Sequence, residues 1–136
     1  MWRVNIMKMY LSNVVKLGKF YTARKYSLED GEQLIFQLPK SEESGRFIGR
    51  VCAIGYFGSW SEGVTEESRQ HYNRNWGYAI NLSQIRRLNA DERFNLLDVL
   101  GETRSNRYDG QSTLVKFTEQ DERDLLSAKR SLFIVR

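Results

Sequence analysis

The residues best suited to chemistry in this sequence are aromatic rings that a hydrophobic core does not need. Trp60 follows a long apolar run among serines and glycines, Phe20 and Tyr21 follow a predicted helix, and Trp76 ends a long polar stretch. Bases of nucleic acids stack on such rings for about 1–3 kcal/mol each, and an apolar slot gains roughly 0.8 kcal/mol more from a methyl group. The alternative is that these rings, Trp76 and Phe20 above all, are core plugs.

Basic residues near the N-terminus could supply the phosphate contacts of such a site. Residues 1–28 carry six basic side chains and no acidic one, whereas residues 29–70 carry eight acidic and four basic side chains. A one-sided basic segment is the electrostatic footprint of a polyanion-binding protein. We therefore expect phosphate contacts from Lys8, Lys16, Arg24 and Lys25. The alternative is that these are solvated surface residues of an ordinary domain.

Residues that could catalyse a reaction or bind a metal form no recognisable constellation. Cys52 lies in an apolar run and is interpreted as a core thiol, and His71 has no nucleophile beside it in the sequence. A single cysteine and a single histidine argue against disulfides, thiolate clusters and most histidine zinc sites. Solvation and helix dipoles account for the paired acidic residues. We expect a binding protein that is not an enzyme and has no metal or cofactor.

The 136 residues and the net charge of +4 are typical of one small basic domain spanning the whole chain. No apolar run is long enough to cross a membrane, and the N-terminus lacks a signal-peptide pattern. The expected setting is reducing and intracellular, which is cytoplasmic in a prokaryote. The apolar end, residues 131–136, indicates either a docking segment or the junction with a longer protein.

The elements that must position these residues alternate between strands and helices. Strands are expected at 2–6, 33–38, 46–57, 76–82 and 112–117, and helices at 10–17, 89–100 and 118–126. Residues 20–30, 59–75 and 102–110 are expected to be connections without regular structure. Short strands linked by hairpins predict an α+β fold, in which a small, curled, mostly antiparallel sheet or barrel is flanked by helices.

Several strings resemble the YTH and EVE domains of the PUA-like superfamily. Residues 33–57 combine an apolar strand, a short polar turn and the run Phe47-Ile48-Gly49-Arg50-Val51, as in the hairpin of those domains. Residues 76–85 resemble their next strand and its exit. Residues 106–111, NRYDGQ, resemble the Asn-Ser-Arg-Asp-Xaa-Gln loop of YTH domains. The resemblance covers nearly the whole chain in order and spacing, and it implies a PUA-like fold.

These families hold a modified base in an aromatic cage, so the resemblance implies the same for this chain. By position, Phe20 or Tyr21 matches the first cage aromatic, and Trp60 matches the second. Asn5 lies where such domains place polar groups against the base edge, and Asp109 belongs to the matching loop.

The matching loop also departs from the YTH pattern at one position. Tyr108 replaces the family's arginine, which leaves Arg107 as the substitute phosphate contact. Gln111 agrees with the family's glutamine.

The expected function is a non-catalytic reader of a modified base, with N6-methyladenine first and 5-substituted cytosine second. Phe20 or Tyr21, Trp60 and Trp76 would sandwich the base. DNA is slightly favoured over RNA, because EVE- and YTH-like domains also serve as specificity modules of modification-dependent restriction systems; reading duplex DNA then requires base flipping. Two other functions stay open: a generic PUA-like RNA-binding domain, and a protein-interaction module centred on Trp60 and residues 59–75.

Overall fold

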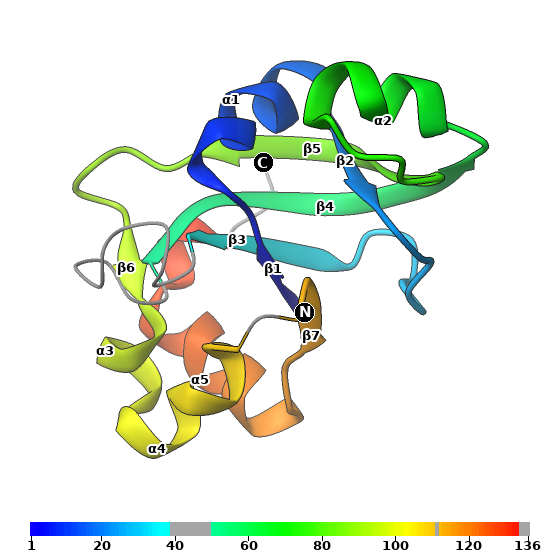
Figure 1. Cartoon of the computed structure of the whole chain (residues 1–136). Coiled ribbons are helices and arrows are strands. Elements are labelled where there is room, and N and C mark those ends of the chain that lie inside the picture. Colours follow the sequence, from blue (N-terminus) through cyan, green and yellow to red (C-terminus); the bar gives the residue numbers. More distant parts are fainter. Residues whose placement is uncertain (39–49, 111, 134–136) are drawn as a thin grey trace.

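The computed structural model describes residues 1–38, 50–110 and 112–133 (Figure 1). The strands are β1 (Trp2–Asn5), β2 (Lys19–Thr22), β3 (Gln33–Leu38), β4 (Arg50–Glu62), β5 (Tyr78–Arg87), β6 (Phe94–Asn95) and β7 (Leu114–Lys116). The helices are α1 (Lys8–Leu17), α2 (Thr65–Tyr72), α3 (Leu96–Leu100), α4 (Glu102–Ser105) and α5 (Glu119–Ala128), with short 3-10 turns η2 (Asn106–Tyr108) and η3 (Arg130–Leu132).

One curled sheet unites all the strands of the described residues, in the order β2-β5-β4-β3-β1-β7, with β6 added to β4. Strands β1 and β3 run parallel, and the other pairs in this part of the chain are antiparallel. Register shifts in β4 near Tyr56 and Phe57 are bulges of the kind that bend a sheet. Gly58 permits the bend, since a Cβ there would lie 3.0 Å from the Asn81 carbonyl oxygen. The predicted α+β class with a curled, mostly antiparallel sheet is confirmed.

Helices cover both faces of the sheet (Figure 1). Val4 and Phe36 face the core beneath α1 and α2, whereas Ile35 and Ile54 face the core against α3 and α5. This alternation follows from the strand period of two, which sends neighbouring side chains to opposite faces. A sheet buried on both faces explains why the sequence of β3, QLIFQL, is almost continuously apolar.

Two segments that the sequence predicts to be irregular contain regular structure. Residues 20–30 include most of β2, which pairs with β5, and residues 59–75 include the end of β4 and all of α2. Helix α2 has no apolar stripe in its sequence, TEESRQHY, and the residues that it buries are Ser68 and Tyr72. Tertiary packing holds it instead: the Tyr72 ring stacks on Tyr10 at 4.2 Å, and the Tyr10 hydroxyl donates to the Tyr72 carbonyl at 2.7 Å.

The C-terminal helices agree with the sequence in one case and differ in another. Thr118 caps α5 by accepting the Asp121 N–H at 3.2 Å, as predicted. The helix expected over 89–100 is instead a turn, strand β6 and the short α3, because Phe94 pairs with Val51 of β4. The loop expected over 102–110 contains α4 and η2. The predicted turn 40–45, residues 46–49 and Gln111 lie outside the described residues.

Candidate nucleic-acid-binding site

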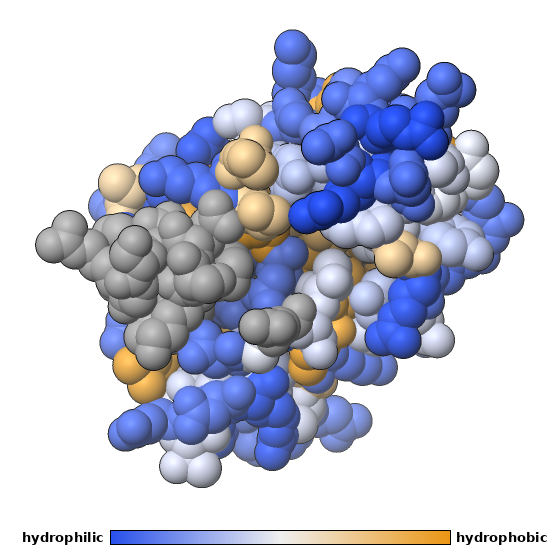
Figure 2. Space-filling view, in the orientation of Figure 1, coloured by the Kyte–Doolittle hydropathy of each residue, from blue (hydrophilic) through white to orange (hydrophobic). Residues whose placement is uncertain are grey.

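A polar hollow lies where β1 and β3 end and α1 begins. Figure 2 shows the surface hollowed over β1, with hydrophilic atoms at its base and weakly hydrophobic atoms on the side of α1. Asn5 is the last residue of β1 and pairs in register with Gln37 of β3. The turn after η2 lies on the other side of Asn5, because β1 also pairs with β7. Three elements that are distant in sequence therefore meet at this point.

Two side-chain amides tie these elements together. The Asn5 amide Nδ2 donates to the carbonyl oxygens of Gly110 at 2.6 Å and Ser112 at 3.2 Å. The Gln37 amide Nε2 donates to Asn5 Oδ1 at 3.1 Å and to the Tyr108 carbonyl oxygen at 2.6 Å. All N–H donors of both amides are thus used, and the oxygens keep unused lone pairs.

Two neighbours of Asn5 in the sheet, Gln37 and Arg3, carry buried polar atoms without partners among the described residues. Gln37 is 1% exposed, and its Oε1 accepts no hydrogen bond within the described residues. Arg3 is completely buried; its Nη1 donates to the Ser112 and Thr113 carbonyl oxygens at 2.5 and 3.3 Å, while Nε and Nη2 have no partner in the same part of the chain. Burial lowers the pKa of Arg3 to about 10, and the nearby Asp109 opposes this shift. Unpaired buried polar atoms are rare in native proteins, because each one costs the free energy of removing a polar group from water.

A second polar network fixes the turn that accepts from Asn5. The buried Tyr108 hydroxyl donates to Asp121, which is 2% exposed and also accepts from Arg104 Nε at 2.8 Å and Nη2 at 2.5 Å. Burial acts to raise the pKa of Asp121, but hydrogen bonds from Tyr108, Arg104 and Thr118 outweigh it and lower the pKa. Tyr108 is therefore a structural anchor, and Arg107, which is exposed and 3.8 Å from Asp121, is the side chain available to a phosphate.

The aromatic residues predicted to stack a base do not line this hollow. Phe20 and Tyr21 are 3% and 0% exposed, which places them in the core of the protein. Phe20 packs against Phe36 and Tyr72, and the Tyr21 hydroxyl donates to Glu67. They are buried because β2 lies beneath α2, two elements that the sequence did not predict. The structure therefore gives these rings a core role and does not support the predicted stacking.

Trp60 is also distant from Asn5 along the fold. Gln37 pairs with Val51 of β4, and Trp60 is nine residues further along that strand, or roughly 30 Å of extended chain. Trp60 packs against Phe57 and Tyr78, and Trp76 against Tyr72. The predicted site thus divides: Asn5 and Asp109 share one region with Arg107, whereas Trp60 lies at the far end of β4.

The predicted phosphate contacts are all exposed, but they differ in availability. Lys8 and Lys16 lie on α1, which starts three residues after Asn5. Arg24 lies over the Tyr26 ring at 4.7 Å, and Lys25 is bound to Glu62 at 3.0 Å. In the described residues neither lysine of α1 has an ion pair, so these two are the cations best placed beside the hollow.

Arg3 and Gln37 are site residues that the sequence reasoning missed as ligands. In the sequence, Arg3 is one charge of the basic N-terminal segment, and Gln37 lies within an otherwise apolar strand. The signal is present in the sequence, because a polar residue inside a strand that is otherwise buried on both faces needs a partner. Which partner it has depends on the register of β1 against β3, which the sequence does not specify.

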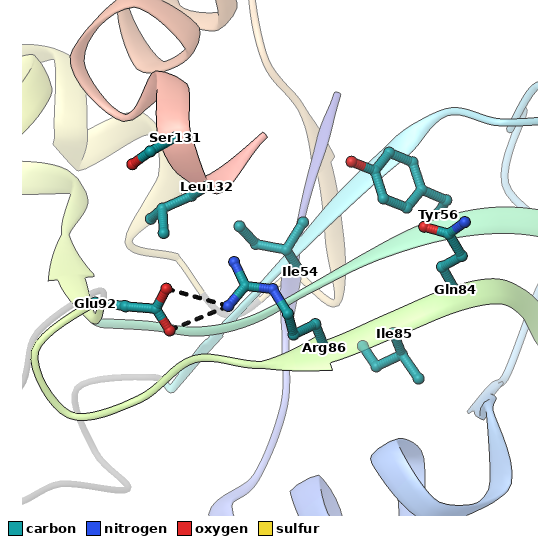
Figure 3. Close-up of a pocket in the computed structure, with 8 residues that line it drawn as sticks. All are labelled: Ile54, Tyr56, Gln84, Ile85, Arg86, Glu92, Ser131 and Leu132. Carbon is teal, nitrogen blue, oxygen red and sulfur yellow. Dashed lines mark hydrogen bonds and ion pairs between the residues drawn. The ribbon is translucent and has the colours of Figure 1, made fainter. Parts of the chain in front are cut away.

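A second cavity of about 640 Å³ lies over β4 and β5, beside η3 (Figure 3). It shares no residue with the hollow. Among the described residues, no group of three histidine, cysteine or carboxylate side chains could hold a metal ion. No helix in this part of the chain has the length and apolar character that a membrane crossing requires.

Comparisons with known proteins identify the fold. No protein-family model matches the chain, and no curated protein matches it. Solved structures of ASCH from Zymomonas mobilis do: that protein superposes with a TM-score of 0.59 at 14% identity, over 93% of each chain. Its tyrosine-to-phenylalanine variant gives 0.57 at 14% identity, over 93% of this chain and 96% of that one. Its serine-to-alanine variant gives 0.58 at 13% identity, over 93% and 94%. The chain therefore has the fold of these ASCH structures, which agrees with the PUA-like fold that the sequence predicted.

Proposed function

We propose that this protein is a non-catalytic nucleic-acid-binding domain that takes one unpaired base into the hollow beside Asn5 and Gln37. The observation that carries the proposal is the unpaired Oε1 of Gln37, buried beside a half-buried asparagine whose own donors are used. A buried acceptor of this kind needs a donor from a ligand or from water.

The chemistry of the hollow favours a base that carries an exocyclic amino group. The side-chain oxygens of Asn5 and Gln37 can accept a hydrogen bond, but the N–H groups of both amides are used, so a ligand group that binds to these two residues must donate. The first backbone N–H groups of α1, at Lys8 and Met9, have no partner within the helix and can donate in return. Adenine and cytosine offer this combination, an amino donor next to a ring-nitrogen acceptor.

A methylated base is the finer part of the proposal. N6-methyladenine keeps one amino N–H for an acceptor and adds a methyl group that gains by leaving water. Met7 and Met9, which are 39% and 66% exposed, follow Asn5 closely and provide adaptable apolar surface for that methyl. 5-substituted cytosine is the second candidate. Thioether side chains would here replace the aromatic walls that the sequence suggested.

The backbone of the nucleic acid would contact the basic residues around the hollow, namely Lys8 and Lys16 on α1 and Arg107 on η2. DNA stays slightly favoured over RNA as the ligand, because the domains that the sequence resembles also serve as specificity modules of restriction systems. A single-stranded RNA would avoid the cost of flipping the base, a few kcal/mol.

The test is a binding panel of matched single-stranded oligonucleotides, in DNA and RNA, with adenine, N6-methyladenine, cytosine or 5-methylcytosine at one position. We expect the N6-methyladenine strands to bind most tightly. Asn5→Ala should weaken the binding of every oligonucleotide in the panel at least about tenfold. The substitution removes the Asn5 Oδ1 acceptor and the hydrogen bond that holds the turn at Gly110.

Trp60→Ala is the matched control, and it should leave the panel unchanged because Trp60 lies far along β4. If Trp60→Ala abolishes binding while Asn5→Ala does not, the hollow is not the site. Equal affinity for methylated and unmethylated strands would instead support a generic RNA- or DNA-binding domain. The burial of Phe20 and Tyr21 in the core and the position of Trp60 at the far end of β4 are the observations that favour this second function.

The electrostatic part of the proposal has its own test. The double substitution Lys8→Gln and Lys16→Gln should weaken oligonucleotide binding at low salt, and it should reduce the slope of log Kd against log salt concentration by about one to two. Arg123→Gln, which removes one positive charge at an exposed position of α5, should leave the slope unaltered. A protein-interaction module would show no steep slope in the unsubstituted protein.

A further inference from the structure

The cavity over β4 and β5 is built from residues that the proposed function does not use. Its lining consists of Ile54, Tyr56, Gln84, Ile85, Arg86, Glu92, Ser131 and Leu132, and its volume is about 640 Å³. Figure 3 shows Tyr56 and Gln84 on one side and the Arg86–Glu92 pair on the other, with Ile54 between them and with Ser131 and Leu132 above Glu92. Cavities of about 300–1,000 Å³ suit small organic ligands.

One wall of the cavity belongs to a row of cross-strand partners, in which Tyr56 lies between two glutamines. Gln33, Tyr56 and Gln84 are register partners on β3, β4 and β5, so they form a row across the sheet. The Tyr56 ring is half-buried, and its hydroxyl has a long contact of 3.5 Å from Gln33 Nε2. Gln84 is exposed and offers both a donor and an acceptor. This wall has the components that stack and read a flat heterocycle.

The opposite wall holds a cation in a fixed orientation. Arg86 Nη1 donates to both carboxylate oxygens of Glu92 at 3.1 Å, and Glu92 Oε1 also accepts the Asn89 N–H at 3.0 Å. Among the described residues the side chain of Arg86 donates hydrogen bonds through Nη1 alone, so its Nε and Nη2 N–H groups can donate to a ligand. The side chain is 50% exposed. A guanidinium with two adjacent N–H groups matches the oxygens of a phosphate.

The surroundings of the cavity favour an anion. Segments 84–93 and 129–132 carry five basic and two acidic residues: Arg86, Arg87, Arg93, Lys129 and Arg130 against Asp91 and Glu92. Within the lining Glu92 balances the charge of Arg86, and the excess of positive charge comes from neighbouring residues such as Lys129 and Arg130, which precede Ser131 and Leu132. A ligand with one phosphate and a planar ring would complement both walls.

We propose that this cavity binds one nucleotide unit, with its base on the Tyr56 ring beside the Gln84 amide and its phosphate on Nε and Nη2 of Arg86. The ligand is either a free nucleoside monophosphate or a nucleotide within a strand. The inference goes beyond the proposed function, since it uses other strands and survives if the hollow at Asn5 binds nothing.

The experiment is a titration of the ¹⁵N-labelled full chain with adenosine and cytidine monophosphate, and separately with a single-stranded oligonucleotide. We expect the backbone amide signals of Tyr56, Gln84 and Arg86 to shift. Arg86→Gln and Tyr56→Leu should each weaken the interaction about tenfold, while Tyr56→Phe, which keeps the ring, should bind like the unsubstituted protein. Asn5→Ala should leave the shifts caused by the monophosphates unchanged, which separates this site from the hollow.

The two sources give different results. Shifts with the monophosphates identify a free nucleotide as sufficient, and shifts with the oligonucleotide alone identify a strand. The proposal is wrong if neither ligand moves these signals, or if Arg86→Gln binds as tightly as the unsubstituted protein. Arg86 is exposed, so this variant remains decisive even if Tyr56→Leu fails to fold, which circular dichroism would reveal.

Discussion

Replacing Phe20 with alanine is expected to lower the free energy of unfolding by about 3–5 kcal/mol. The ring is 3% exposed and meets the rings of Phe36 and Tyr72 edge-on at 5.9 and 6.1 Å. Truncation removes these contacts and leaves a cavity between β2 and α2, an element with little apolar surface of its own. Urea unfolding followed by circular dichroism measures the loss.

Two controls separate the core role of Phe20 from the stacking role that the sequence suggested. Phe20→Leu retains most of the apolar volume and should cost less than about 1.5 kcal/mol. Met9→Ala, at a position that is 66% exposed, should change stability by less than about 0.5 kcal/mol. If Phe20→Ala keeps its stability but loses oligonucleotide binding, the ring is a base contact after all.

Asp121→Ala is expected to have the second large effect, lowering the free energy of unfolding by about 3 kcal/mol. The carboxylate is 2% exposed and holds the buried Tyr108 hydroxyl and one edge of Arg104. Removing one member of such a network leaves the others desolvated and unpaired, and this cost dominates. Because Tyr108 supplies the carbonyl that Gln37 binds, the variant should also weaken oligonucleotide binding.

The same carboxylate predicts a pH dependence. The folded-state pKa of Asp121 is lowered from its ordinary value of 3.8, so its contribution to stability is complete above about pH 4. That contribution is lost as the pH falls from there through the folded-state pKa. Unfolding curves between pH 7 and pH 2.5 should therefore converge for the unsubstituted protein and Asp121→Ala as the pH falls.

A constant difference between the two proteins across this range would show that Asp121 does not titrate with folding. Glu67, Glu92 and Asp124 also have lowered pKa values, so acid destabilises both proteins. Only the difference between them belongs to Asp121. Arg123→Gln, a change at an exposed position of the same helix, should follow the unsubstituted protein at every pH.

The sequence by itself determined the features that arise from neighbouring residues. The apolar run of β3, the long β4 with its bends, and the capping of α5 by Thr118 depend on side-chain period, glycine and a local hydrogen bond. The basic N-terminal segment and the curled α+β sheet were also predicted from the sequence. Local physics is enough here because each signal lies within a few residues of its effect.

Only the tertiary structure decided where the functional side chains meet. Helix α2 is polar in sequence and forms because Tyr72 packs on Tyr10, and that packing is what buries Phe20. The register of parallel β1 against β3 brings Asn5 to Gln37, and the bends of β4 leave Trp60 at its far end. A one-residue shift in register would send each side chain to the other face, so no pattern along the chain specifies these neighbours.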